Sequence, residues 1–344
     1  MGLISGSSYR WLLKLFQYAL GGAALLWLVV NAEWERVLTV IDGIHYGVVA
    51  VILAASVAET LCRFSMWHVL LNGVSTTPFS TAARTTLITN FVNQILPSRL
   101  SGRSIAPLVL RHYTRYDWSE VVTIAGVHTA LYAVCNGFVA AIGLAFFLPE
   151  FSPGLLIVLA GSIALYLFVG VGSLLAGWQF DSVTQIIGNV RSRLERIPLV
   201  SGGFSAVAGR LPSFSDGVAD VFDTLLTDHR VIGLYTGGWI ASRMVFPGLR
   251  VGLLLDALNV GFSPVMLPVV LVTAYSVTLL PITPGGIGVA EASATLVFGA
   301  LGVAEPIIAP VILVDRFLSV YLPSLAGWYP VTRLDLTAIA AGEQ

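Results

Sequence analysis

Charged residues are scarce in this sequence of 344 amino acids. Only 11% of the residues are Asp, Glu, Lys or Arg, whereas hydrophobic residues make up 56%. Soluble domains carry roughly 25% charged residues, so this composition excludes a solvated globule. Several apolar runs approach or exceed the ~20 residues that a helix needs to cross a bilayer. The sequence therefore predicts an all-α, polytopic helical membrane protein that forms one integral membrane domain over residues 1–344.

The residues and motifs of common enzymes are also few. The two cysteines, Cys62 and Cys135, lie inside apolar runs, where cysteine usually behaves as a small hydrophobic residue. The five histidines are scattered, and GxSxG, Walker, HExxH and aspartate-rich metal motifs are absent. We therefore expect no metal and no cofactor, and a transporter rather than an enzyme. The net charge of −1 gives no general attraction to nucleic acid.

Eight apolar segments are predicted to be membrane segments. The sixth and seventh are short, so they could instead form one hairpin that dips into the membrane, which leaves the parity of the topology unchanged. The first lacks a small-residue cleavage site and is expected to be retained as a helix. The segments are 12–30, 45–72, 119–148, 153–178, 229–256, 264–281, 287–303 and 306–330.

The basic residues predict the orientation. Arg10 and Lys14 precede the first segment, and clusters of five arginines follow both the second and the fourth, whereas the "PEFSP" connection has no basic residue. Lys and Arg collect in cytoplasmic loops of membrane proteins. We therefore predict a multi-pass protein of the cell membrane with both termini in the cytoplasm.

Two long connections do not fit a simple loop. Within 180–230, the residues Val218, Val221, Phe222, Leu225 and Leu226 form a helical apolar stripe, which suits a helix at the membrane interface or against the bundle. The arginines of "VRSRLERIP" either contact head groups or only reflect topology. Residues 80–118 are too polar for a free crossing and too apolar for a plain loop. They are predicted to form a re-entrant or cytoplasmic segment that breaks at Pro97.

A second broken segment lies within 274–303 and reads "PITPGGIGVAE" over 281–291. Proline interrupts a helix, and glycine accepts positive φ, so one helix should end and another begin here. The new helix N-terminus would present free N–H groups that attract anions. Glu291 could cap those groups, accept from a substrate cation or pair with an arginine. The breaking residues are Pro281, Pro284, Gly285, Gly286 and Gly288.

The two broken segments share a short pattern. "LPSRLSG" over 96–102 and "LPITPGG" over 280–286 agree at the Leu, the first Pro and the last Gly. Paired broken segments are the sequence pointer to a binding site between transporter repeats. The pattern therefore indicates either an inverted structural repeat or two unrelated re-entrant turns.

Several charged and amide side chains lie inside the predicted segments. Glu59 and Arg63 are four residues apart and should pair along one helix face, while Arg250 and Asp256 could reach the interface by snorkelling. Intramembrane ionisable groups are costly and are functional candidates by default. Arginine also suits bidentate recognition of phosphate. We expect a polar cavity that binds a lipid with an anionic head group and includes Glu59, Arg63, Asn90, Asn93, Arg99, Arg103, Arg243 and Arg316.

The run "LPITPGGIGVAE" resembles the signature of the lysylphosphatidylglycerol synthase transmembrane-region family, whose members are also called flippase-like or UPF0104 proteins. Pro281, Pro284, Gly285, Gly286, Ile287, Gly288 and Glu291 match it in order. "NFVNQILPSRLSGR" and Arg316 in the last segment look like the other marked regions of that family. The resemblance covers nearly the whole chain. One departure is Gly102 followed by Arg103, where the family commonly has Gly-Glu, and a head group of different charge is one consequence.

The resemblance implies an integral membrane protein that handles lipids. The family includes the flippase part of bacterial aminoacyl-phospholipid proteins and archaeal relatives linked to dolichol-borne glycans. The chain is expected to lack the separate soluble synthase domain and therefore not to aminoacylate lipid. Our first hypothesis is a translocase for a phospholipid or polyprenyl-phosphate-linked lipid. The alternative is a membrane-embedded transferase, or an accessory to one, in lipid modification. A homo-oligomer and a separate lipid-modifying enzyme remain open as partners.

Overall fold

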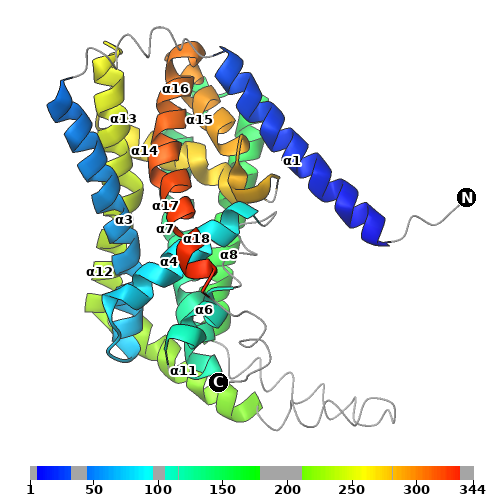
Figure 1. Cartoon of the computed structure of the whole chain (residues 1–344), viewed down its shortest axis with the longest axis vertical. Helices are drawn as coiled ribbons and strands as arrows, with labels where there is room; N and C mark the ends of the chain where they lie inside the picture. The colour runs from blue at the N-terminus through cyan, green and yellow to red at the C-terminus, as the bar shows by residue number, and fades with distance from the viewer. Residues whose placement is uncertain are drawn as a thin grey trace, which may run out of the picture.

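The computed structural model describes residues 6–31, 45–95, 105–114, 116–178, 211–280 and 282–333, with side chains from 15 in the first range and from 217 in the fifth. Every regular element in these ranges is a helix, which confirms the predicted all-helical fold. Most of the long helices run along the longest axis of the molecule, whereas α4 crosses the bundle obliquely and α1 projects from its side (Figure 1).

The first half of the chain supplies the long helices. These are α1 (Gly6–Asn31), α3 (Tyr46–Val74), α7 (Trp118–Phe147), which continues into a 3₁₀ turn η1 (Leu148–Glu150), and α8 (Pro153–Trp178). In the described residues, four helices are long and apolar enough to cross a membrane: α3, α7 with η1, α8 and the last helical run Glu305–Val331. The chain is thus a helical membrane protein, while the number of eight segments stays a prediction.

The second half consists of shorter helices. One continuous run contains α12 (His229–Ile240), a π-helical segment η2 (Ala241–Val245) and α13 (Phe246–Ala257). Next come α14 (Leu267–Ala274), the 3₁₀ segment η3 (Tyr275–Leu279), the short turn η4 (Pro284–Gly286) and α15 (Val289–Ala300). The last run joins α16 (Glu305–Arg316), a second π-helical segment η5 (Phe317–Tyr321), α17 (Leu322–Ala326) and α18 (Trp328–Val331).

Both π-helical segments are followed by a proline. Pro247 and Pro323 each stand at the second position of the α-helix that succeeds the π segment. Proline has no N–H to donate and clashes with the carbonyl four residues earlier, and a π-bulge is one way for a helix to absorb that defect. The carbonyls that lose their ordinary partner in this way belong to Arg243 and Ser319.

Three more helices complete the described chain: α4 (Phe79–Ile95), α6 (Ala106–Tyr113) and α11 (Leu211–Thr227). In α11, Val218, Val221, Phe222 and Leu225 are buried. A Cβ at Gly177 of α8 would lie 2.1 Å from the Phe222 ring. The predicted stripe is therefore packed against the bundle, which is one of the two alternatives left open by the sequence. The predicted break at Pro97 lies outside the described residues.

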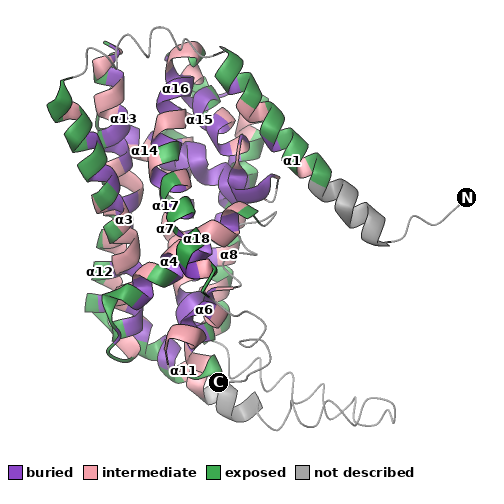
Figure 2. Cartoon of the chain, viewed as in Figure 1, coloured by how far each residue is buried: buried purple, intermediate pink, exposed green. Residues whose placement is uncertain are grey.

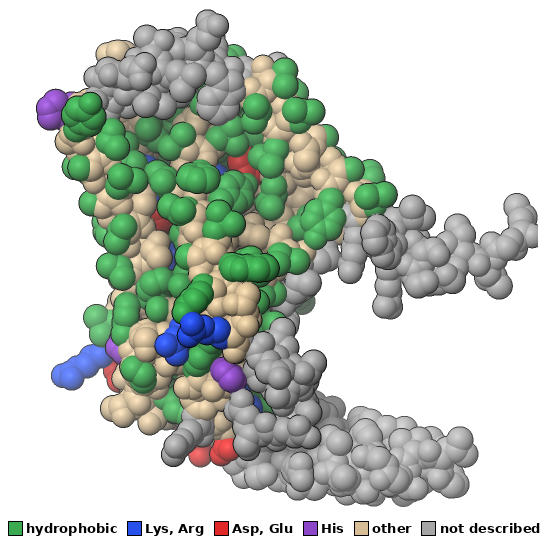
Figure 3. Space-filling view, viewed as in Figure 1, with side chains coloured by type: hydrophobic (Ala, Val, Ile, Leu, Met, Phe, Trp, Pro, Cys, Tyr) green, Lys and Arg blue, Asp and Glu red, His purple; other side chains and the backbone are tan. Residues whose placement is uncertain are grey.

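Burial follows a lipid-facing pattern. Buried residues concentrate between the helices, and exposed residues cover the outer faces of α1 and α3 (Figure 2). Many large apolar side chains are exposed, including Phe138, Phe168 and Ile157. Apolar side chains are spread along the visible surface of the bundle, and the most prominent charged side chains lie near its lower end (Figure 3). Such a surface suits hydrocarbon as the solvent.

Candidate functional site

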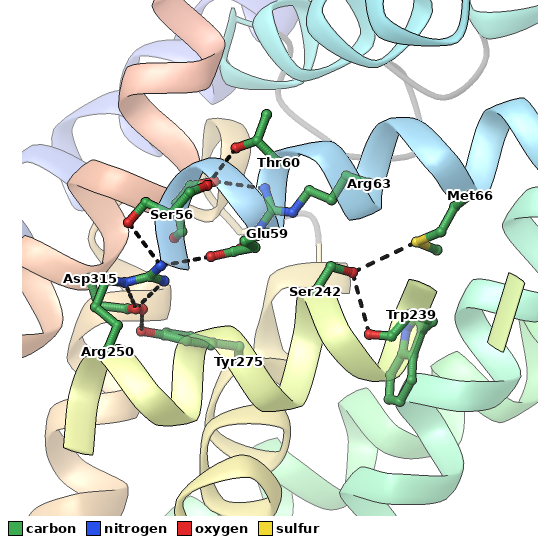
Figure 4. Close-up of polar contacts among 11 residues, drawn as sticks. Ser56, Glu59, Thr60, Arg63, Met66, Trp239, Ser242, Arg250, Tyr275 and Asp315 are labelled. Atoms are coloured by element: carbon green, nitrogen blue, oxygen red, sulfur yellow. Dashed lines mark hydrogen bonds and ion pairs between the residues drawn. The ribbon is translucent and has the colours of Figure 1, made fainter. Parts of the chain in front are cut away.

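Two arginines and two carboxylates form a buried network at the centre of the bundle (Figure 4). Arg250 of α13 is 0% exposed. Its Nη1 donates to Glu59 Oε2 at 2.8 Å, and its Nε donates to Asp315 Oδ1 at 2.8 Å. Tyr275 donates to the second oxygen of Asp315 at 2.9 Å. Glu59 also pairs with Arg63 one turn along α3, as predicted from their spacing. The network ties α3, α13, η3 and α16 together.

Arg63 makes a further contact, which the proline after η5 explains. Arg63 Nη1 donates to the Ser319 carbonyl oxygen at 2.7 Å. The residue four positions after Ser319 is Pro323, which has no N–H for that carbonyl. Irregular backbone at membrane depth needs a partner from the protein, and Arg63 supplies it here. Arg63 therefore holds the π-helical segment of the last run against α3.

Glu291 has three hydrogen-bond partners and is 0% exposed. One carboxylate oxygen accepts from Arg316 Nε at 2.7 Å and from the Tyr321 hydroxyl at 2.6 Å. The other accepts from the Gly288 backbone N–H at 2.7 Å. Two of the predicted alternatives thus hold together, because Glu291 caps its own helix and also pairs with an arginine. The Arg316 guanidinium lies above the Tyr275 ring, with 5.5 Å between its Cζ atom and the ring centroid.

The turn that precedes Glu291 depends on glycine. Gly285, Gly286 and Gly288 have φ values of 62°, 73° and 79°, as expected from the predicted irregular turn. A Cβ at Gly288 would lie 2.3 Å from the carbonyl oxygen of Gly21 in α1, and a Cβ at Gly285 would lie 2.1 Å from Gln94 Oε1 in α4. The turn is therefore held between α1 and the C-terminal end of α4.

The C-terminal end of α4 is fixed from the other side as well. The Tyr18 hydroxyl of α1 donates to the Ile95 carbonyl oxygen at 2.7 Å. This bond ties the last described turn of α4 to α1. The structure thus brings the end of the helix that precedes Pro97 against the turn at Pro284–Gly286, although the two are far apart in sequence.

A partly open pocket of about 110 Å³ lies between α3, α4, α7 and the two π-helical segments. We call it the polar pocket. On α4 it is lined at helical spacing by a stripe of neutral polar side chains, and on the other helices by two arginines among aromatic and small residues. Its polar lining residues are Arg63, Thr86, Thr89, Asn90, Asn93, Gln94, His128, Tyr132, Ser242 and Arg243.

Four polar atoms of the polar pocket have no hydrogen-bond partner among the described residues. They are Thr89 Oγ1, Asn93 Oδ1, Gln94 Oε1 and Arg243 Nε, and each of these atoms is buried. Arg243 stands at 5.7 Å from the Tyr132 ring centroid. Orphaned buried polar atoms are rare in native structures and call for a missing water, ion or ligand. The polar pocket therefore has the chemistry of a binding site.

The predicted site residues that the structure describes lie in three places. Arg63, Asn90, Asn93 and Arg243 meet in the polar pocket, whereas Glu59 belongs to the central ionic network. Pro284, Gly285, Gly286, Gly288, Glu291 and Arg316 form the turn and the capping network beside α1. Pro97, Arg99, Gly102, Arg103 and Pro281 lie outside the described residues. The role of all these residues in binding substrate stays a prediction.

Sequence reasoning missed Arg250 and Asp315 as members of the ionic network. The sequence left open that Arg250 reaches the membrane interface by snorkelling, but the structure buries Arg250 completely, whereas Asp256, six residues later, is exposed. The usable signal was charge balance, because a segment with Glu59 and Arg63 needs partners on other helices. Of the four pocket residues with unpartnered atoms, Asn93 and Arg243 were predicted as site residues, whereas Thr89 and Gln94 were not.

The described fold and site define a polytopic helical membrane protein with a polar interior. Residues 14–327 match the family model described as the lysylphosphatidylglycerol synthase TM region. The chain belongs to this family, which connects it to lipid-related function and confirms the resemblance seen in the sequence.

One curated relative is a UPF0104 membrane protein from Methanothermobacter thermautotrophicus. It is 26% identical to the chain over 177 residues, which cover 50% of the chain and 48% of the relative. The match thus spans about half the length of each protein. No solved structure matches the chain.

Proposed function

We propose that the protein is a membrane lipid translocase, in which the polar pocket carries the head group of a phospholipid or polyprenyl-phosphate-linked lipid between the leaflets. The observation that supports this most is the polar pocket itself, which lies in a bundle with an apolar exterior and in which four buried polar atoms have no partner in the described part of the chain. A head group with a phosphate is an acceptor for arginine and would replace the missing partners.

The remaining arrangement supports the same function. Three of the four interior arginines in the described chain are paired with carboxylates, so they hold the helices in place without needing a ligand. The break at residues 282–288 supplies irregular backbone next to the end of α4, and discontinuous helices near the midplane are a feature of transporter sites. We propose that this break and the one predicted at Pro97 are re-entrant and flank the translocation path.

Lipid movement can be measured directly. The purified protein is reconstituted into liposomes that contain a trace of phospholipid with a fluorescent acyl chain, and a membrane-impermeant reductant is then added outside. A translocase allows the reductant to bleach more than the outer-leaflet half of the fluorescence. If several phospholipid and lipid-linked glycan probes all bleach as in protein-free liposomes, the proposal is wrong.

A further inference from the structure

The charges in the described interior do not balance. Glu59, Asp315 and Glu291 are buried carboxylates, while the arginines of the same interior are Arg63, Arg243, Arg250 and Arg316. Arg63 and Arg250 share Glu59 and Asp315, and Arg316 pairs with Glu291. Arg243 has no carboxylate within ion-pair distance among the described residues. A cation inside the membrane is costly without a counter-charge, so a ligand anion beside Arg243 would supply it.

The opposite wall of the polar pocket is polar but uncharged. Thr89, Asn93 and Gln94 lie on one side of α4, and their unpartnered atoms are oxygens. A carboxamide can accept through its oxygen or donate through its nitrogen, and a threonine hydroxyl does both. A ligand hydroxyl also donates and accepts, so it pairs with these side chains in either orientation of the amides.

The pocket offers nothing that would balance a cationic head group. Its lining in the described chain contains no Asp or Glu. An ammonium group would therefore enter a positively charged pocket and be repelled. This holds although the family takes its name from a lipid that carries lysine.

We infer that the polar pocket selects a phosphodiester lipid with an uncharged, hydroxylated head group, binding the phosphate at Arg243 and the hydroxyls at Thr89, Asn93 and Gln94, and that it disfavours aminoacylated head groups. The inference rests on the proposed function, since it names the substrate class of the same pocket. Binding and translocation are separate measurements, so each can fail alone.

Three lipids with matched acyl chains separate the contributions. Phosphatidylglycerol has one negative charge and two hydroxyls, phosphatidylethanol has the same charge and no hydroxyl, and lysylphosphatidylglycerol has a net positive charge. Affinities for the full chain in nanodiscs or detergent are obtained by native mass spectrometry. We expect phosphatidylglycerol to bind about two- to tenfold more tightly than phosphatidylethanol, as for a neutral hydrogen bond. Lysylphosphatidylglycerol should bind most weakly.

Single substitutions test the phosphate site at Arg243 and the hydroxyl site on α4 separately. Arg243→Gln should weaken both anionic lipids by about ten- to a hundredfold, as for a lost charge-assisted hydrogen bond, while Arg243→Lys should keep the order of the three lipids. Asn93→Leu should lower the affinity for phosphatidylglycerol to the affinity for phosphatidylethanol. Arg230→Gln is the matched control, because Arg230 lies on α12 in the same helical run and is exposed.

Four outcomes of these measurements would overturn the inference or part of it. Equal affinity for phosphatidylglycerol and phosphatidylethanol would overturn the role of the hydroxyls, and tight binding of lysylphosphatidylglycerol would overturn the charge selection. If inorganic phosphate displaces phosphatidylglycerol at equal concentration, the site takes free phosphate and the inference is wrong. Translocation of all three lipids at equal rates, with equal affinities, would refute the inference while leaving the proposed function intact.

Discussion

At the scale of single residues, the interior of the protein is organised by arginine. Arg250 joins three helices through Glu59 and Asp315, and Arg63 compensates a carbonyl that faces a proline. A buried ion pair adds little net stability by itself, but the loss of one partner leaves an uncompensated charge. The arginines therefore fix how the helices pack around the polar pocket.

Removal of the Asp315 charge should expose this dependence. We expect Asp315→Asn to lower the free energy of unfolding by about 3 kcal/mol, because Arg250 loses one of its two carboxylate partners in a buried site. Denaturant unfolding of the purified protein in micelles measures the effect. The same change at Asp256, which is exposed on α13, should have almost no effect. Equal unfolding curves for the two variants would show that the network does not support the fold.

At the scale of helices and turns, the segment from Thr283 to Glu291 is tightly constrained. It depends on positive φ at three glycines and on the close approach of α1 and α4. Sequence reasoning could predict the break and the positive φ values from Pro and Gly alone. It could not predict that Gly21 and Gln94 lie against the turn, because contacts between distant segments depend on how the whole bundle packs.

Two glycines separate backbone strain from crowding. Gly288 and Gly302 both have positive φ, but a Cβ at Gly302 would meet nothing within 4 Å. Gly302→Ala should therefore cost only the strain of a left-handed alanine, about 1 kcal/mol. Gly288→Ala adds a clash with the backbone of α1. It should therefore lower the melting temperature in detergent several-fold more than Gly302→Ala does. Similar melting temperatures for the two variants would mean that α1 does not pack on the turn.

At the scale of the whole molecule, the all-helical architecture and the family were predictable from apolar runs and one motif. The four helices that are long and apolar enough to cross a membrane coincide with predicted segments, because length and hydropathy are local properties. The partners of Glu59 and Glu291 were harder to predict, because they are two arginines and a tyrosine from other helices. The polar pocket was predictable only as a set of residue types on α3, α4 and the fifth segment.

The predicted orientation can be tested with cysteine labelling. Ser119, one residue after Trp118 at the start of α7, lies beside Gly217 of α11, whereas η1 continues α7 at its other end. In a background without Cys62 and Cys135, Ser152→Cys should react with a membrane-impermeant maleimide added to intact cells. Asp223→Cys on α11 should react only after the membrane is permeabilised, because the arginine-rich connections are predicted to be cytoplasmic. The reverse pattern would invert the topology.

The central proposal is that head groups cross the membrane through the polar pocket, with Arg243, which has no carboxylate partner among the described residues, as the cation on the path. The most direct test is the rate of fluorescent phosphatidylglycerol translocation in proteoliposomes that contain equal amounts of folded wild type, Arg243→Gln or Arg230→Gln. The account predicts fast translocation for wild type and Arg230→Gln, and a rate at least about tenfold lower for Arg243→Gln. Translocation by Arg243→Gln at the wild-type rate would contradict it.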